Sequence, residues 1–133
     1  MSPDQDPGRP QAWLRRARSN LARARQLAGT PDVLYEDLCF DAQQAAEKAL
    51  KAVLVAKGVR VPRTHAIAEL LTLAQMAHVS IPAHVRSATL LTPYAVEARY
   101  PGVWEEVTAG DYEQALHVAG QVLAWAEEQV STK

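Results

Sequence analysis

A helix over residues 32–57 would carry apolar side chains over most of its surface and would gather most of its polar residues on one narrow line. The polar positions of this segment recur at steps of four and three residues, which places them in a single line along a helix. A helix with so little polar surface has to be covered by other helices on most of its sides. The segment therefore predicts the central helix of a bundle, exposed to solvent only along this polar line. The polar line consists of Asp37, Asp41, Gln44, Lys48 and Lys51.

Apolar residues follow the same three-and-four spacing elsewhere in the chain. They predict a helix over residues 11–28, a short one over residues 64–77, one that begins at Ile81–Pro82, and a last one over residues 108–130. Pro93 either kinks the fourth helix or restarts it, because proline removes one donor from the helical ladder. No segment alternates between apolar and polar residues, so no sheet is expected. The predicted fold class is all-α, an up-and-down bundle of four long helices plus one short helix.

Short polar residues and glycines mark the expected helix ends. Asp32 and Thr64 are placed to cap the second and third helices, and Gly58 ends the second. Thr108 with Asp111 resembles a capping box at the start of the last helix. The helical spacing also predicts a buried face. Its members are Leu38, Ala45, Ala49, Val53, Leu70, Leu116 and Leu123.

The length of 133 residues suits one ordinary domain. We expect residues 1–9, which are polar and contain proline and glycine, to form a disordered leader, and residues 10–133 to form the helical domain. The single Cys39 excludes an internal disulfide and is expected to be a small buried side chain. No apolar run approaches about 18 residues, so a cytoplasmic protein is expected.

Charge is balanced over the whole chain but uneven along it. The 14 basic and 15 acidic residues leave a net charge of −1, which argues against a protein that is basic all over. Residues 1–30 hold six arginines against two aspartates, whereas residues 31–133 hold eight basic and thirteen acidic residues. Such a dipole favours an oriented partner, either a polyanion near the first helix or a second subunit, although both stretches also suit ordinary solvated helix faces.

Several short motifs occur in a defined order along residues 10–130. They are residues 42–51 (AQQAAEKALK), 64–65 (TH), 91–94 (LTPY), 97–101 (EARYP) and 112–116 (YEQAL). In this order the motifs resemble the HEPN family, the higher eukaryotes and prokaryotes nucleotide-binding domain, in its compact prokaryotic form. The resemblance implies a helical bundle that commonly forms homodimers. It also implies a frequent pairing with a minimal nucleotidyltransferase, often as a two-gene toxin–antitoxin module.

Many members of this family are metal-independent ribonucleases that use an arginine followed four to six residues later by a histidine. Arg99 stands where that arginine is expected. Trp104 and Glu105 occupy positions at which the histidine would be expected, and the first histidine after Arg99 is His117. Arg60 and His65 are separated by four residues, as the motif requires. They lie in the loop before the third helix, which is the wrong place for the motif, so we interpret this match as a coincidence. The departure after Arg99 argues against the usual histidine-dependent cleavage.

The candidate site residues follow from the chemistry of RNA cleavage and phosphate binding. Cleavage without a metal needs a base for the 2′-hydroxyl and a cation for the phosphate, for which Arg99, Tyr100 and His65 are the candidates. Nucleotide or RNA binding needs cations and a stacking ring. The candidates for it are Lys48, Lys51, Arg60, Arg63 and Trp104. Alternatively, Lys51 pairs with Glu47 at four-residue spacing and solvates the helix. No metal site and no cofactor is predicted.

Three functions remain open at this point. The favoured one is a HEPN protein that binds a minimal nucleotidyltransferase in a toxin–antitoxin-like pair, with nucleotide or RNA as a further ligand. The second is a metal-independent ribonuclease toxin that uses Arg99. The third is a purely structural helical dimer. A homodimer is expected in each, and no membrane is expected as a partner.

Overall fold

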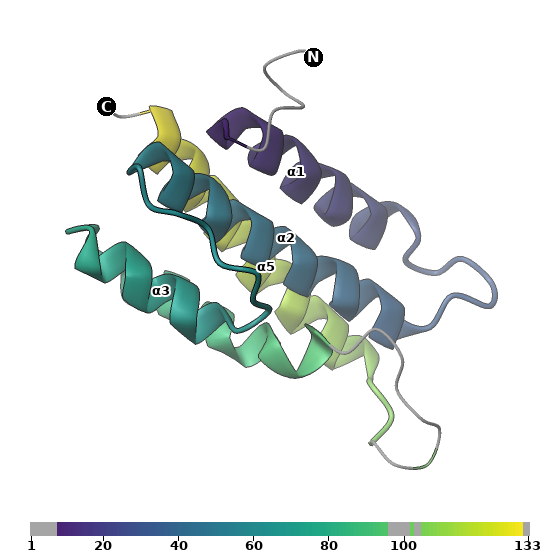
Figure 1. Ribbon diagram of the computed structural model, residues 1–133. Coiled ribbons are helices and arrows are strands. Elements are labelled where there is room, and N and C mark those ends of the chain that lie inside the picture. Colours follow the sequence, from purple (N-terminus) through teal and green to yellow (C-terminus); the bar gives the residue numbers. More distant parts are fainter. Residues whose placement is uncertain (1–7, 96–101, 103–104, 132–133) are drawn as a thin grey trace.

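The structure is a computed structural model that describes residues 8–95, 102 and 105–131. In this part of the chain every regular element is a helix, which confirms the all-α fold class (Figure 1). None of these helices is long and apolar enough to cross a membrane. The elements are α1 (Pro10–Gln26), α2 (Tyr35–Ala56), α3 (Ile67–Met76), α4 (Ala83–Arg86), the 3₁₀ helix η2 (Ser87–Ala95) and α5 (Ala109–Ser131).

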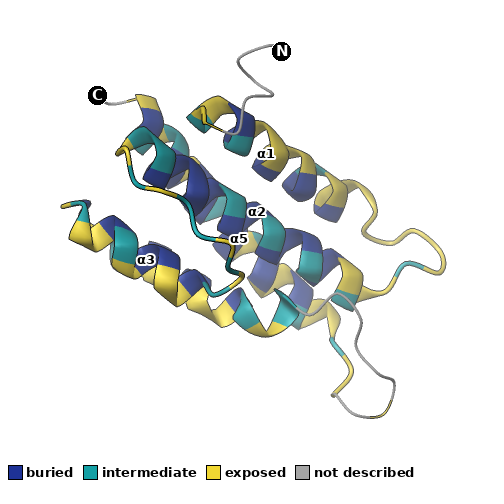
Figure 2. Ribbon diagram, viewed as in Figure 1, coloured by how far each residue is buried: buried dark blue, intermediate teal, exposed yellow. Residues whose placement is uncertain are grey.

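Helix α2 is the central element of the bundle, as its sequence predicts. It packs along α1 and α5 over most of its length and also contacts α3 and η2. Figure 1 shows α1 and α3 flanking α2 on opposite sides, with α5 behind it. Alanines on α2 let these neighbours approach closely, and Figure 2 shows the buried residues concentrated along α2. The fully buried alanines of α2 are Ala42, Ala45, Ala46, Ala49 and Ala52.

Two of the three predicted helix starts differ from the structure. Asp32 does not cap α2, because it adopts a left-handed φ of 68° in the preceding turn and Leu34 occupies the cap position. Thr64 lies two residues before the cap of α3, where its Oγ1 accepts a hydrogen bond from the backbone N–H of Ala66 at 3.0 Å. The capping box of Thr108 and Asp111 is confirmed by reciprocal hydrogen bonds of 2.9 and 3.1 Å.

The fourth predicted helix changes its winding earlier than expected. It is α-helical only over α4 and continues as the 3₁₀ helix η2, which contains Pro93. The change therefore begins six residues before the proline. The hydroxyls of Ser87 and Thr89 donate to the carbonyls of Ala83 and Arg86, at 3.3 and 3.1 Å. Such hydroxyl-to-carbonyl bonds compete with the regular helical ladder.

The predicted buried face is confirmed with one exception. Leu116 is only half-buried, because it lies at the rim of α5 in a shallow hollow of about 510 Å³ that Arg25 of α1 also lines. Cys39 is fully buried, as expected. The buried members of the predicted set are Leu38, Ala45, Ala49, Val53, Leu70 and Leu123.

The polar line of α2 is not a solvent-exposed strip, so that prediction is wrong. Only Asp37 is exposed, whereas Gln44 and Lys48 are half-buried and Asp41 and Lys51 are buried. The reason is that α1 lies over this line, where Asn20 and Arg23 hydrogen-bond to Asp41 and Lys48. Lys51 donates a hydrogen bond to Glu47 of α2 itself and lies over the ring of Trp13 of α1. Helix α2 therefore carries its charges inside the fold.

Candidate functional site

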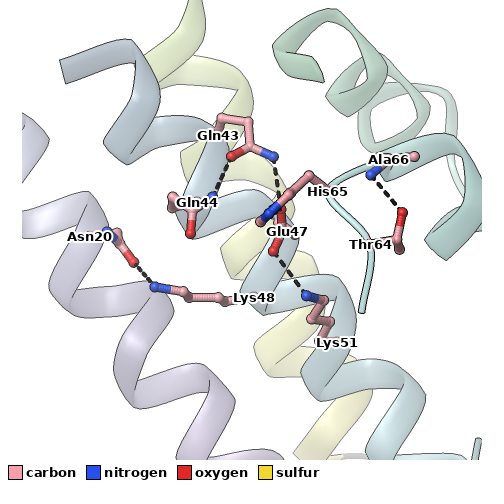
Figure 3. A network of polar contacts seen from close by, with 9 residues as sticks. All are labelled: Asn20, Gln43, Gln44, Glu47, Lys48, Lys51, Thr64, His65 and Ala66. Atoms are coloured by element: carbon pink, nitrogen blue, oxygen red, sulfur yellow. Dashed lines mark hydrogen bonds and ion pairs between the residues drawn. The ribbon is translucent and has the colours of Figure 1, made fainter. Parts of the chain in front are cut away.

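A row of polar side chains is buried on the side of α2 that lies between α1 and the segment 57–66 leading to α3 (Figure 3). Gln43, Glu47 and Lys51 follow one another at four-residue spacing and are 0%, 2% and 7% exposed. Buried polar and charged groups are costly unless each is paired or hydrogen-bonded. The row therefore requires a network of partners, which the neighbouring elements provide.

Glu47 is the centre of this network. Its Oε1 accepts a hydrogen bond from Nε2 of Gln43 at 3.1 Å and lies 2.9 Å from Nδ1 of His65. Its Oε2 accepts a hydrogen bond from Nζ of Lys51 at 2.9 Å. Burial raises the pKa of Glu47, but the hydrogen bonds from Gln43, Lys51 and His65 together outweigh burial and hold the pKa below its usual value. The carboxylate is therefore ionised at neutral pH.

Lys51 connects this carboxylate to α1. Its ammonium forms the ion pair with Glu47 and also lies 5.4 Å from the ring centroid of Trp13. A cation at this distance from an aromatic face is attracted by the ring quadrupole, and the attraction grows when both groups are shielded from water. The predicted pairing of Lys51 with Glu47 is thus present, but inside the fold rather than on a solvated surface.

A second network lies between α1 and α2. Nζ of Lys48 donates to Oδ1 of Asn20 at 2.8 Å, and Nδ2 of Asn20 donates to Oδ1 of Asp41 at 3.0 Å. Arg23 donates to the same Asp41 carboxylate at 2.8 Å. Burial is the largest effect on Lys48 and lowers its pKa; the charges of Arg16 and Arg23 lower it further, whereas those of Glu47 and Asp41 raise it. Lys48 is therefore a partly desolvated cation with both cations and carboxylates around it.

His65 lies at the protein surface, whereas its partner Glu47 is buried. Its side chain is 70% exposed, whereas that of Glu47 is 3% exposed. The turn at Thr64, closed by the hydrogen bond from the N–H of Ala66, positions this part of segment 57–66 against α2. In Figure 3 the imidazole reaches across from the segment to the carboxylate. Glu47 thus holds one ring nitrogen while the rest of the ring faces solvent.

The structure brings together some of the predicted site residues. Lys51 contacts Oε2 of Glu47 and His65 contacts Oε1, and Lys48 belongs to the neighbouring network. Arg60 and Arg63 are exposed on the segment that also carries His65. The predicted catalytic residues Arg99 and Tyr100 and the predicted stacking residue Trp104 lie outside the described residues.

The sequence interpretation missed the residues that organise the site. The sequence pattern indicates Glu47 only as a surface partner of Lys51 and gives no role to Gln43 or Asn20. A signal was present, because Gln43, Glu47 and Lys51 form a second polar line at four-residue spacing on an otherwise apolar helix. Two polar lines on one central helix indicate that at least one of them is buried.

Comparison with known proteins identifies the fold. The model of the HEPN domain matches residues 10–129. The structure of TT1696 from Thermus thermophilus is 36% identical, with a TM-score of 0.78. That of ST0689, an archaeal HEPN homologue, is 31% identical, with a TM-score of 0.71. Each alignment covers 92% of this chain and 98% of the other. No curated protein matches the chain. With a family match over nearly its whole length and these structural relatives, the chain belongs to the HEPN domain family.

Proposed function

We propose that this protein is the HEPN partner of a minimal nucleotidyltransferase in a two-gene, toxin–antitoxin-like pair, and that nucleotide or RNA binds beside the Glu47 network. Membership of the HEPN family supports a role connected with nucleotides or RNA. In this proposal the chain supplies a binding surface and the partner supplies the nucleotidyl-transfer chemistry.

The observation that carries the ligand-binding part is the surplus of positive charge at the two networks between α2 and its neighbours. Four cations, Arg16, Arg23, Lys48 and Lys51, lie on or beside the two networks, whereas these contain two carboxylates. The exposed Arg60 and Arg63 add charge on the adjoining segment. Arginine and lysine are the side chains that bind phosphate oxygens best. A phosphate-bearing ligand is the class that this surface favours.

The protein-binding part is supported by the separation of charge between α1 and α5. Arg15 and Arg25 of α1 are exposed, and so are Glu113 and Glu128 of α5. Surfaces of opposite sign steer two proteins into one orientation and fix how they meet. The same separation allows two copies of this chain to pair, and a homodimer is part of the proposal.

The test of the partnership is co-expression with the nucleotidyltransferase encoded next to this gene, if one is present there. One protein carries an affinity tag, and co-purification followed by light scattering gives the composition of the complex. The proposal expects a stable complex that contains both proteins. An unrelated nucleotidyltransferase of similar size is the matched control. The partnership is refuted if a neighbouring nucleotidyltransferase elutes separately, or if no such gene exists.

The same preparation separates the two other functions. A purely structural dimer binds neither the partner nor nucleotide. A ribonuclease degrades RNA without a metal, and Arg99→Ala abolishes this activity if Arg99 supplies the cation for the phosphate. The partner proposal instead expects weak or absent degradation by the isolated chain.

A further inference from the structure

The contact between Glu47 and His65 determines which nitrogen of the imidazole is available. Glu47 is ionised and can only accept hydrogen bonds, so Nδ1 of His65 must carry a proton and donate it. The two ring nitrogens lie on different sides of the ring, and the ring is 70% exposed. Nε2 therefore faces away from the carboxylate, at the surface of the protein.

The Glu47 carboxylate has no need of a further ligand. Gln43, Lys51 and His65 already supply three donors to its two oxygens, and the side chain is buried. A metal ion would have to displace one of these donors and approach beside the ammonium of Lys51. The exposed Arg60 and Arg63 on the same segment as His65 favour an anion instead.

A backbone turn and the contact with Glu47 hold His65 in position. The side chain of Thr64 accepts a hydrogen bond from the N–H of Ala66, and Glu47 fixes the orientation of the ring. A group that is held in place before binding loses little conformational freedom when a ligand arrives. When the ring is protonated, both nitrogens donate, and Nε2 can donate to a phosphate oxygen. Arg60 and Arg63 are exposed on the same segment.

We propose that Nε2 of His65 is the phosphate-contacting atom of an anion site at the outer edge of the Glu47 network, and that Glu47 is its positioning residue. The ligand is the phosphate of a nucleotide or of an RNA strand. This inference rests on the ligand-binding part of the proposed function and names the atom that makes the contact. It does not depend on the nucleotidyltransferase partner.

The test uses His65→Asn in the full chain. Asparagine retains an N–H donor close to the position of Nδ1 but has nothing that corresponds to Nε2. Because the His65 side chain is largely exposed, the variant is expected to fold. His78→Asn is the matched control, since His78 is also exposed and its left-handed φ of 66° suits asparagine.

Inorganic phosphate, AMP and a short single-stranded RNA with a 5′-hydroxyl are each titrated by calorimetry. Phosphate is expected to compete with both other ligands. His65→Asn is expected to weaken binding of all three by about tenfold or more, the usual loss for one hydrogen bond to a charged group. His78→Asn is expected to bind as the wild type does. Stronger binding of AMP than of RNA identifies a nucleotide phosphate as the ligand, and the reverse order identifies the RNA backbone.

The positioning role of Glu47 has its own readout. In nitrogen NMR spectra of the ligand-free protein, the neutral form of His65 is expected to carry its proton on Nδ1. The phosphate contact is made by the protonated ring, in which Nε2 also carries a proton. Glu47→Asp, which keeps the charge, should preserve that preference, whereas Glu47→Gln should weaken it. A tautomer unaffected by Glu47→Gln overturns the positioning role.

Unchanged phosphate affinity in His65→Asn overturns the phosphate contact. The phosphate contact is also overturned if the wild-type protein binds none of the three ligands, or if inorganic phosphate does not compete with RNA for binding. In each of these cases a nucleotidyltransferase that still co-purifies leaves the partnership standing, so failure of this inference is distinguishable from failure of that part of the proposed function.

Discussion

Oε1 of Glu47 lies 2.9 Å from Nδ1 of His65, although the two residues are eighteen positions apart and belong to different layers of the fold. The carboxylate is buried in α2, whereas the imidazole lies on the surface segment 57–66. A change in the surface group therefore acts directly on a buried ion pair. The first two predictions concern this buried ion pair.

The first prediction concerns stability in acid. The pKa of Glu47 is lower in the folded state than its unfolded value of 4.5, so ionised Glu47 contributes stability above about pH 4.5. This contribution is lost as the pH falls through the folded-state pKa. Glu47→Gln is expected to be less stable at neutral pH and to lose less stability between about pH 5 and about pH 3. Urea unfolding at several pH values measures both effects, with the exposed Glu128→Gln as control. Parallel curves for wild type and Glu47→Gln would contradict the account.

The second prediction concerns the other half of the ion pair. Lys51→Met leaves the buried Glu47 carboxylate without its cation, and breaking a buried pair in this way typically costs about 3–5 kcal/mol. Lys57→Met, at an exposed position just after α2, is expected to change the free energy of unfolding by less than about 0.5 kcal/mol. Chemical denaturation compares the two variants. Equal effects would show that Lys51 is not engaged with Glu47.

A third prediction concerns the side-chain hydrogen bond between Tyr112 of α5 and Ala24 of α1. The hydroxyl of Tyr112 donates to the carbonyl of Ala24 at 2.9 Å, and the Tyr112 side chain is buried. Tyr112→Phe is expected to lower the free energy of unfolding by about 1 kcal/mol, because the carbonyl loses its donor away from water. Tyr35→Phe is the control, since Tyr35 packs against the same ring but is exposed. A larger loss of stability for Tyr35→Phe would contradict this account, because it would mean that the Tyr35 hydroxyl contributes more to stability than that of Tyr112.

A fourth prediction separates the true core from its rim. Leu70 is fully buried and Leu116 is half-buried at the hollow between α1 and α5. Leu70→Ala is expected to cost about 2–5 kcal/mol, because it leaves a cavity that the surroundings fill only in part. Leu116→Ala should cost clearly less. Thermal unfolding of both variants gives the order, and a reversed order would mean that α5 is rotated from its described position.

The helical architecture could be predicted from the sequence because it rests on local spacing. The apolar residues of α2 identify it as the central helix, and the capping box of Thr108 and Asp111 starts α5 as expected. The cap of α2 could not be predicted in the same way. Asp32 is a favourable cap residue, but the turn places it in a left-handed conformation and leaves the cap position to Leu34.

The site could be predicted only in part. The sequence indicates Lys51 and His65 as candidates by their chemistry. That both contact Glu47 depends on how segment 57–66 crosses α2, which the sequence pattern does not show. Spacing along one helix cannot show which polar line another element will cover. Leu116 illustrates the opposite error. Helical spacing places it on the apolar face, but it lies at the edge of the bundle and is only half-buried.

The most direct measurement of the central claim is the mapping of ligand binding by NMR. AMP is titrated into the labelled protein, and the changes in backbone amide shifts are assigned to residues. We predict that the largest changes lie at Lys48, Lys51 and His65, and that they are much smaller in His65→Asn at the same AMP concentration. Changes that instead cluster around Leu116 and His117, in the hollow between α1 and α5, would contradict the assignment of the ligand to the Glu47 network.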